Sequence, residues 1–183
     1  SLGLVGSEMC IRDSAKNADQ RRQVASTQKI ITALCTVEAG DLERVVTIQP
    51  VDVSCEPTRL DIKPGETYTR RELLNVLLVK SANDVARALA RDVAGSVEQF
   101  SDLMNARSEQ LGMQQSHFRN PNGLPDAQQY STARDMAIAA RQAYRSPLIR
   151  AITRQKSTQF RYENGREITP VSYTHLRAHE TEA

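Results

Sequence analysis

The hydrophobic pattern early in the chain predicts a helix that begins near Ser26 and runs to about Ala39. Apolar residues recur here at helical spacing, so they should form one stripe that packs against a core. Gly40 can then supply the left-handed turn that ends many helices. The predicted stripe consists of Ile30, Ala33, Leu34 and Val37.

Capping residues and apolar spacing predict five further helices. Thr69 and Glu72 have the spacing of a capping box, which starts the first of them. That helix breaks at residues 81–83, and Asp84 opens the second, which stops at Gly95. The other three begin at Ser96, Thr132 and Pro147.

Short runs of strand-forming residues lie between turn signals. Residues 45–48, followed by a turn at 63–66, predict a small hairpin or a pair of short strands. Residues 157–162 predict another strand, and the Asn164-Gly165 turn should fold the chain back on it, with the partner strand cut off at Pro170.

Composition narrows the class of protein. A chain of 183 residues fits one domain, and no apolar run approaches the roughly 18 residues of a membrane helix. A formal charge of +2 and 4% aromatic residues argue against a nucleic-acid partner. Three cysteines make neither a metal-binding spacing nor an even-numbered disulfide framework, and we expect Cys35 to be a small buried hydrophobe. No metal or other cofactor is expected.

Ser26 and Lys29 are candidates for nucleophilic chemistry. Three residues apart on a helix, they share one face, and a lysine whose ammonium is destabilised by burial can take a proton from a serine hydroxyl. A helix N-terminus also offers free N–H groups to a developing negative charge. However, Ser-x-x-Lys occurs by chance about once in a chain of this length. The alternative is a capped surface helix with a solvated lysine.

Two later stretches add specific signals. Residues 77–84 contain Ser81-x-Asn83 on a tight loop between two predicted helices. Residues 118–126, which read FRNPNGLPD, precede residues 130–137, YSTARDMA. Such loops can direct side chains into a cleft. Alone, Ser81 and Asn83 would be interpreted as helix caps, which both residue types favour.

With the Ser-x-x-Lys motif, these stretches resemble the serine-type D-Ala-D-Ala carboxypeptidases, the low-molecular-mass penicillin-binding proteins of peptidase family S11. The resemblance runs from about Ala15 to Thr169. It implies an α+β fold of the β-lactamase/transpeptidase type, represented here mostly by its helical part with an incomplete antiparallel sheet. It also implies a periplasmic or other extracytoplasmic location, although no signal sequence or membrane anchor is visible in the chain.

The resemblance also assigns roles. Ser26 would attack the peptide bond between two D-alanines of a peptidoglycan stem peptide, with Lys29 as proton acceptor. Ser81 would relay a proton to the leaving nitrogen, and Asn83 would hold Lys29 and the substrate amide. β-Lactams would act as inhibitors. Many relatives have His in place of Asn122, so that residue receives no role, and Lys80 is expected to lie outside the cleft.

The two ends depart from the family pattern. Residues 1–14 and 171–183 resemble translated sequencing adapter, so we expect a partial catalytic domain over residues 15–170. His175 and His179 could face one metal on a helix, but no third ligand is evident. The family's Lys-Thr-Gly motif, which recognises the substrate carboxylate, is missing. We therefore expect the chain as given to be inactive and marginally stable, with apolar helix faces uncovered.

Other functions remain open at this point. A serine β-lactamase or related wall hydrolase would share the fold and the Ser-x-x-Lys motif. A non-catalytic wall-binding module would bind stem peptide without being acylated. A helical interaction domain with coincidental motifs would hold Ser26, Lys29, Ser81 and Asn83 far apart.

Overall fold

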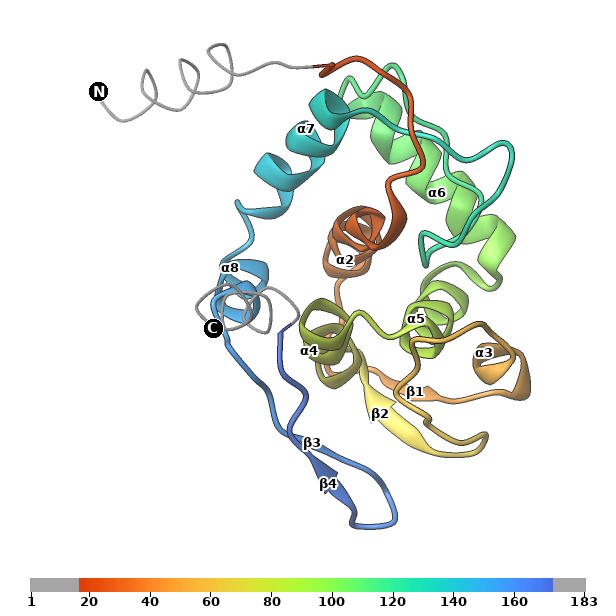
Figure 1. Cartoon of the computed structure of the whole chain (residues 1–183). Coiled ribbons are helices and arrows are strands. Elements are labelled where there is room, and N and C mark those ends of the chain that lie inside the picture. The colour runs from red at the N-terminus through yellow and green to blue at the C-terminus, as the bar shows by residue number, and fades with distance from the viewer. Residues whose placement is uncertain (1–16, 173–183) are drawn as a thin grey trace, which may run out of the picture.

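A computed structural model describes residues 17–172 of the chain. The predicted foreign segment 1–14 lies outside the described residues, and so do Cys10, His175 and His179. Helices dominate the described part, and the two small sheets lie at its periphery (Figure 1). Within residues 17–172, none of the helices combines the length and apolar character needed to cross a bilayer.

Helix α2, Lys29–Glu38, lies at the centre of the fold (Figure 1). A short 3-10 helix, η1 (Ala25–Gln28), leads directly into it. The predicted end of the helix is confirmed, because Ala39 caps it and Gly40 follows with a left-handed φ of 72°. Four helices pack around α2, namely α4 (Arg70–Lys80), α5 (Asn83–Ala94), α6 (Val97–Gln110) and α7 (Ala133–Ala143).

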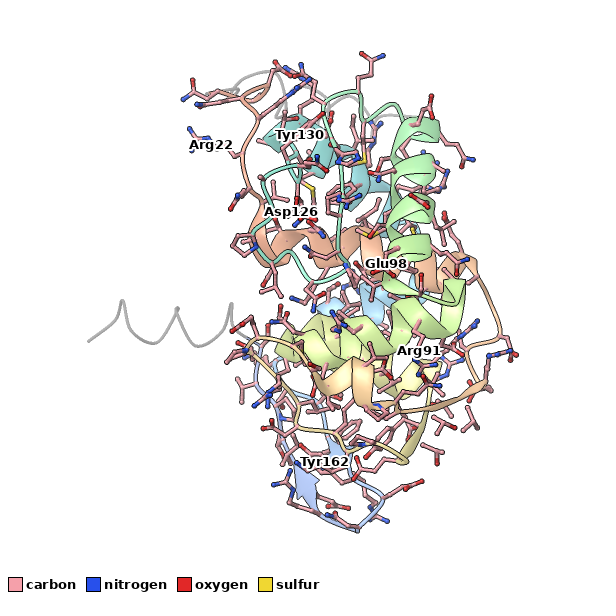
Figure 2. The ribbon with its side chains drawn as sticks, turned by 90° about the vertical axis from the view of Figure 1, so that its right-hand side faces the viewer. Arg22, Arg91, Glu98, Asp126, Tyr130 and Tyr162 are labelled. Carbon is pink, nitrogen blue, oxygen red and sulfur yellow. The ribbon has the colours of Figure 1, made fainter. Side chains whose placement is uncertain are left out.

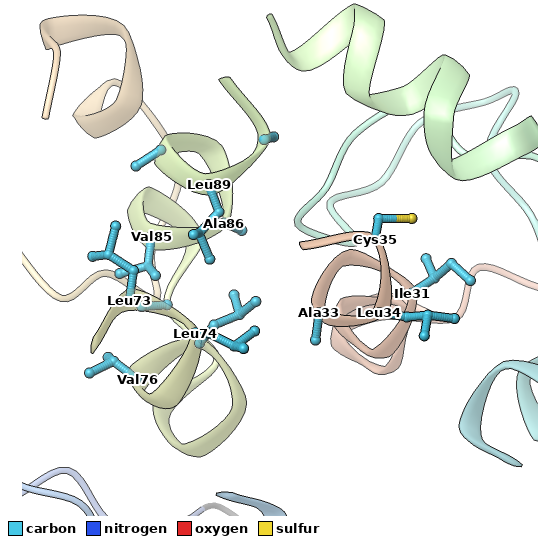
Figure 3. Close-up of a cluster of buried hydrophobic side chains, with 14 of the residues drawn as sticks. Ile31, Ala33, Leu34, Cys35, Leu73, Leu74, Val76, Val85, Ala86 and Leu89 are labelled. Atoms are coloured by element: carbon cyan, nitrogen blue, oxygen red, sulfur yellow. The ribbon is translucent and has the colours of Figure 1, made fainter. Parts of the chain in front are cut away.

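Helix α2 is buried on more than the one predicted stripe. Ala33 and Leu34 are buried as expected, whereas Ile30 and Val37 are only partly buried. Cys35 is also buried, which confirms its prediction, and it points from α2 toward α6 (Figure 3). A single stripe suits a helix at a surface, but a helix with neighbours on several sides buries most of its residues. Each large aliphatic side chain buried in this way contributes about 1.5–3 kcal/mol.

The predicted capping box at the start of α4 is confirmed. The Glu72 N–H donates to Thr69 Oγ1 at 3.2 Å, and the Thr69 N–H donates to Glu72 Oε2 at 2.8 Å. Two of the otherwise unpaired N–H groups at the helix start are thereby satisfied. Helix α4 then ends at Ser81, which has a left-handed φ of 61° and reverses the chain direction.

Helix α5 begins at Asn83, one residue earlier than predicted. The Asn83 N–H donates to the Thr58 carbonyl at 2.7 Å, so a neighbouring loop, and no side-chain cap, satisfies the first turn. Asp84 is fully buried and accepts hydrogen bonds from the N–H groups of Leu60 and Asp61. This contact fixes the loop before residue 62 against the start of α5.

The strands form two separate antiparallel pairs, β1 with β2 and β3 with β4. A one-turn helix, α3, which the sequence analysis did not predict, follows β1, and the predicted short helix α8 precedes β3. The last pairing continues past Pro170, because the Ser172 N–H donates to the Lys156 carbonyl at 2.8 Å. The elements are β1 (Val45–Thr47), α3 (Pro50–Val53), β2 (Thr67–Thr69), α8 (Pro147–Thr153), β3 (Phe160–Arg161) and β4 (Glu167–Ile168).

An open hollow of about 610 Å³ lies where η1 and the start of α2 meet α7. Its apolar lining includes Val24, Ile30, Met136 and Ala137. This surface is an apolar helix face of the kind that the sequence analysis expected to be left uncovered. The predicted marginal stability stays a prediction.

Candidate active site

Ser26 is an exposed residue of η1, next to the buried start of α2. The helix was predicted to open near Ser26, whereas the α-helical residues begin only at Lys29. The tighter 3-10 turn still brings the two side chains together, and Ser26 Oγ lies 3.4 Å from Lys29 Nζ. This distance is slightly longer than an ordinary hydrogen bond.

Lys29 is only 3% exposed. Besides Ser26, its Nζ contacts Asn83 Oδ1 at 2.9 Å and the Asn122 carbonyl oxygen at 2.6 Å. Burial lowers the pKa of Lys29 to about 8, and the charge of Cys55 opposes this shift. The alternative of a surface helix with a solvated Lys29 is therefore wrong.

Asn83 presents its side-chain oxygen to Lys29 because its amide nitrogen is engaged elsewhere. Its Nδ2 donates to the carbonyls of Glu56 at 3.1 Å and Pro57 at 3.0 Å. The side-chain amide is therefore held in one orientation, with Oδ1 free to accept from Lys29. Asn83 is 4% exposed, so this contact is shielded from water.

Ser81 lies at the junction of α4 and α5, two residues before Asn83. Its backbone caps α4, as the alternative interpretation of this residue expected. Its Oγ is buried and has no hydrogen-bond partner among residues 17–172. The structure thus brings Ser26, Lys29 and Asn83 into contact, while the proton-relay role of Ser81 stays a prediction.

Asn122 belongs to the site although the sequence analysis gave it no role. Its carbonyl oxygen accepts from Lys29, and its Nδ2 donates to the backbone carbonyl of Asn83 at 2.9 Å. Its side chain is 2% exposed, and its Oδ1 has no partner among the described residues. The available signal was its place in the FRNPNGLPD stretch, but a backbone carbonyl leaves no residue-type signature in a sequence.

Both cysteines in the described region are unpaired. Burial raises the pKa of Cys35 to about 12, so this thiol stays protonated and is no nucleophile at neutral pH. Cys55 is half-buried, and burial also raises its pKa. Over residues 17–172, no group of three or more His, Cys, Asp or Glu side chains could hold a metal.

Sequence comparisons agree with this geometry. Residues 14–179 match the family profile described as D-alanyl-D-alanine carboxypeptidase, peptidase S11. DacB2 of Mycobacterium tuberculosis is 35% identical over 79% of this chain and 50% of its own length. DacF of Bacillus subtilis is 35% identical over 69% of this chain and 34% of its own length. The chain thus spans about half or less of the length of these curated D-alanyl-D-alanine carboxypeptidases.

Solved structures extend the similarity to the fold. A penicillin-binding protein homologue from Mycobacterium tuberculosis superimposes with a TM-score of 0.85 at 30% identity, over 91% of this chain and 63% of that one. A Streptomyces K15 DD-transpeptidase variant gives a TM-score of 0.80 at 30% identity, over 89% and 69% of the two chains. The predicted α+β fold of the transpeptidase type is confirmed. This chain belongs to the peptidase S11 family of D-alanyl-D-alanine carboxypeptidases.

Proposed function

We propose that the protein is a serine-type D-Ala-D-Ala carboxypeptidase that acts on peptidoglycan stem peptides through an acyl-enzyme. The observation that carries this proposal is a buried Lys29, with a pKa of about 8, whose Nζ lies 3.4 Å from the exposed Ser26 Oγ. A serine hydroxyl becomes a useful nucleophile when such a base is within reach. The names of the relatives supply the substrate class.

In the first step, Ser26 Oγ attacks the carbonyl carbon of the penultimate D-alanine while its proton moves to Lys29 Nζ. The bond from carbon to nitrogen then breaks, and the departing D-alanine takes a proton at its amino group. Water finally hydrolyses the ester on Ser26, which restores the serine hydroxyl and releases the shortened peptide.

The other two residues have supporting roles in this proposal. Ser81 relays the proton from Lys29 toward the departing nitrogen. Asn83 holds Lys29, and a contact with the substrate amide would have to replace one of the two backbone carbonyls that its Nδ2 already engages. β-Lactams would acylate the same Ser26. Because stem peptides lie outside the cytoplasm, we place the enzyme in the periplasm or another extracytoplasmic part of the envelope.

D-Alanine release tests the proposal. Two peptides that differ only in ending with D-Ala-D-Ala or D-Ala-L-Ala are incubated with the chain and with a version extended through the family's Lys-Thr-Gly segment. We expect the extended version to release the terminal alanine from the first peptide only, with no L-alanine from the second, and the 183-residue chain to show little activity. Rapid penicillin turnover without D-alanine release would instead indicate a β-lactamase. Peptide binding with neither reaction would indicate a wall-binding module.

The pH dependence of acylation should report Lys29. The neutral amine is the base, and its fraction falls about tenfold for each pH unit below the pKa. With a pKa of about 8, acylation of the extended chain by a fluorescent penicillin should rise with pH through about 8 and then level off. Cys55→Ser should retain this rise, at the same or slightly lower pH, since the thiol is not the base and its charge raises the pKa of Lys29. A rise in acylation centred near pH 10.5, the ordinary pKa of lysine, would show that Lys29 is hydrated.

A further inference from the structure

We propose that residues 119–129, here called the clamp loop, position the catalytic base. By pressing the Asn122 carbonyl against Lys29 Nζ, the loop directs the lone pair of the neutral amine toward Ser26 Oγ. This inference rests on the proposed function and deepens it. Within it, Asn120 and Gln129 are positioning residues, which act on Lys29 through the backbone of the loop.

The hydrogens on Lys29 Nζ determine which way its lone pair points. A neutral amine has two N–H donors and one lone pair, arranged tetrahedrally. Asn83 Oδ1 and the Asn122 carbonyl oxygen can only accept, so each takes one N–H, at 2.9 and 2.6 Å. The third neighbour, Ser26 Oγ, can donate its proton. Two obligate acceptors therefore leave the lone pair facing the one hydroxyl that must lose a proton.

The Asn120 side chain shapes the clamp loop around Asn122. Its Oδ1 accepts from three successive backbone N–H groups, those of Asn122 at 3.2 Å, Gly123 at 2.9 Å and Leu124 at 3.2 Å. Its Nδ2 donates to the Leu124 carbonyl at 3.0 Å. One side chain thus supplies the hydrogen bonds that a regular turn would make with its own backbone.

Gln129 closes the loop from its other end. Its Oε1 accepts from the N–H groups of Arg119 at 2.9 Å and Asn120 at 3.1 Å, and its Nε2 donates to the Leu124 carbonyl at 2.8 Å. Gln129 is 5% exposed, so these bonds are shielded from water. The two amide side chains together fix the backbone on both sides of Asn122.

The clamp loop is attached to η1 before Lys29 and to α2 after it. Gln28 Nε2 donates to the Asn120 carbonyl, and Thr32 Oγ1 donates to the Pro121 carbonyl at 2.8 Å. Figure 2 shows the loop, marked by Asp126, beside the N-terminal end of α2. Because Gln28 and Thr32 lie on either side of Lys29 in sequence, these bonds fix the position of the loop along the helix axis relative to Lys29 Nζ.

The contacts around Lys29 Nζ are not ion pairs. The three polar partners of Lys29, on η1, α5 and the clamp loop, are neutral groups. Among the described residues, the titratable group whose charge acts on Lys29 is Cys55, in the loop between α3 and β2. The clamp loop therefore controls the direction of the lone pair on Lys29 Nζ and the access of water to that atom.

The test compares Asn120→Leu with Asn105→Leu. Asn105 also bonds the backbone near this loop, through the carbonyl and N–H of Phe118, but it has no link to Lys29. In the extended chain, Asn120→Leu should lower the high-pH plateau of penicillin acylation by about 10- to 100-fold. A change in the pKa of Lys29 alone would shift the pH at which acylation rises and would leave the plateau rate unchanged. Asn105→Leu should keep the wild-type plateau.

A second readout does not need activity. In the 183-residue chain with ¹³C-labelled lysine, the Lys29 signal is identified by its loss in Lys29→Arg and is followed against pH. Asn120→Leu should admit water and raise the titration midpoint by about one pH unit or more. Gln129→Met should also raise the Lys29 titration midpoint, and it replaces Asn120→Leu in the test if that variant does not fold.

These outcomes separate two failures. If the wild-type extended chain is not acylated, the proposed function is wrong, and the Lys29 titration still decides the role of the clamp loop. A folded Asn120→Leu or Gln129→Met variant with the wild-type plateau, or with an unchanged Lys29 titration, would overturn the inference.

Discussion

Ser26→Ala is expected to abolish covalent labelling of the extended chain by a fluorescent penicillin. The label is an ester on the serine oxygen, so a methyl group at this position leaves no atom to acylate. Ser26 is exposed, and among residues 17–172 its Oγ has one hydrogen-bond partner, Lys29, so the substitution should leave folding intact. Labelling is read on a denaturing gel beside the wild type. Equal labelling of the variant would show that another residue is the nucleophile.

Lys29→Ala should slow the same labelling by about 10²- to 10⁴-fold, the usual contribution of a general base. Lys80 offers a matched control. It is the last residue of α4, adjacent to Ser81 in sequence, and it is half-buried. Lys80→Ala should label at the wild-type rate. Similar slowing in both variants would mean that loss of a positive charge, rather than loss of the base, explains the effect.

Gly123→Ala is expected to destabilise the protein by about 2–5 kcal/mol. Gly123 has a φ of 83°, and a Cβ there would overlap the backbone carbonyl of Ala25, in the turn that carries Ser26. A left-handed alanine costs about 1–2 kcal/mol. Overpacking against backbone adds typically 1–3 kcal/mol, since neither segment can move without breaking other bonds. Denaturant unfolding measures the sum.

Gly165 is a matched control for this substitution. It has the same φ of 83°, but nothing lies within 4 Å of the position of its Cβ. Gly165→Ala should therefore lower the free energy of unfolding only by the cost of an alanine in a left-handed conformation, about 1–2 kcal/mol. The difference between the two variants isolates the contact between Gly123 and Ala25. If both cost the same, that contact contributes nothing to stability.

Local signals explain why much of the fold could be predicted from the sequence. The capping box at Thr69 and the caps at Ser96 and Thr132 depend on residues within one helical turn, and all three are found. The pairing of β3 with β4 also follows from local turn residues, although the loop has three residues, 163–165, and not the two predicted, because the Tyr162 N–H donates to the Arg166 carbonyl at 2.8 Å. In each case the residues that determine the structure are neighbours in sequence.

The missed features depend on residues far apart in sequence. The burial of α2 on several sides requires helices that follow much later, so a single apolar stripe could not indicate it. Ser26 and Lys29 could be paired by spacing alone, whereas the contact of Lys29 with Asn122 spans 93 residues and uses a backbone atom. The start of α5 shifted by one residue because the distant Thr58 carbonyl replaced a side-chain cap.

The central place of α2 also matters during synthesis. The ribosome makes α2 before any of the four helices that cover it, and roughly 100 residues must follow before α7 is complete. At about 5–20 residues per second, α2 waits for about 5–20 seconds until the last of its partners, α7, is complete. Three of its polar side chains, Lys29, Thr32 and Thr36, are buried in the folded protein. In the nascent chain the same side chains interrupt the apolar residues of the helix, and we expect them to limit its self-association until the covering helices emerge.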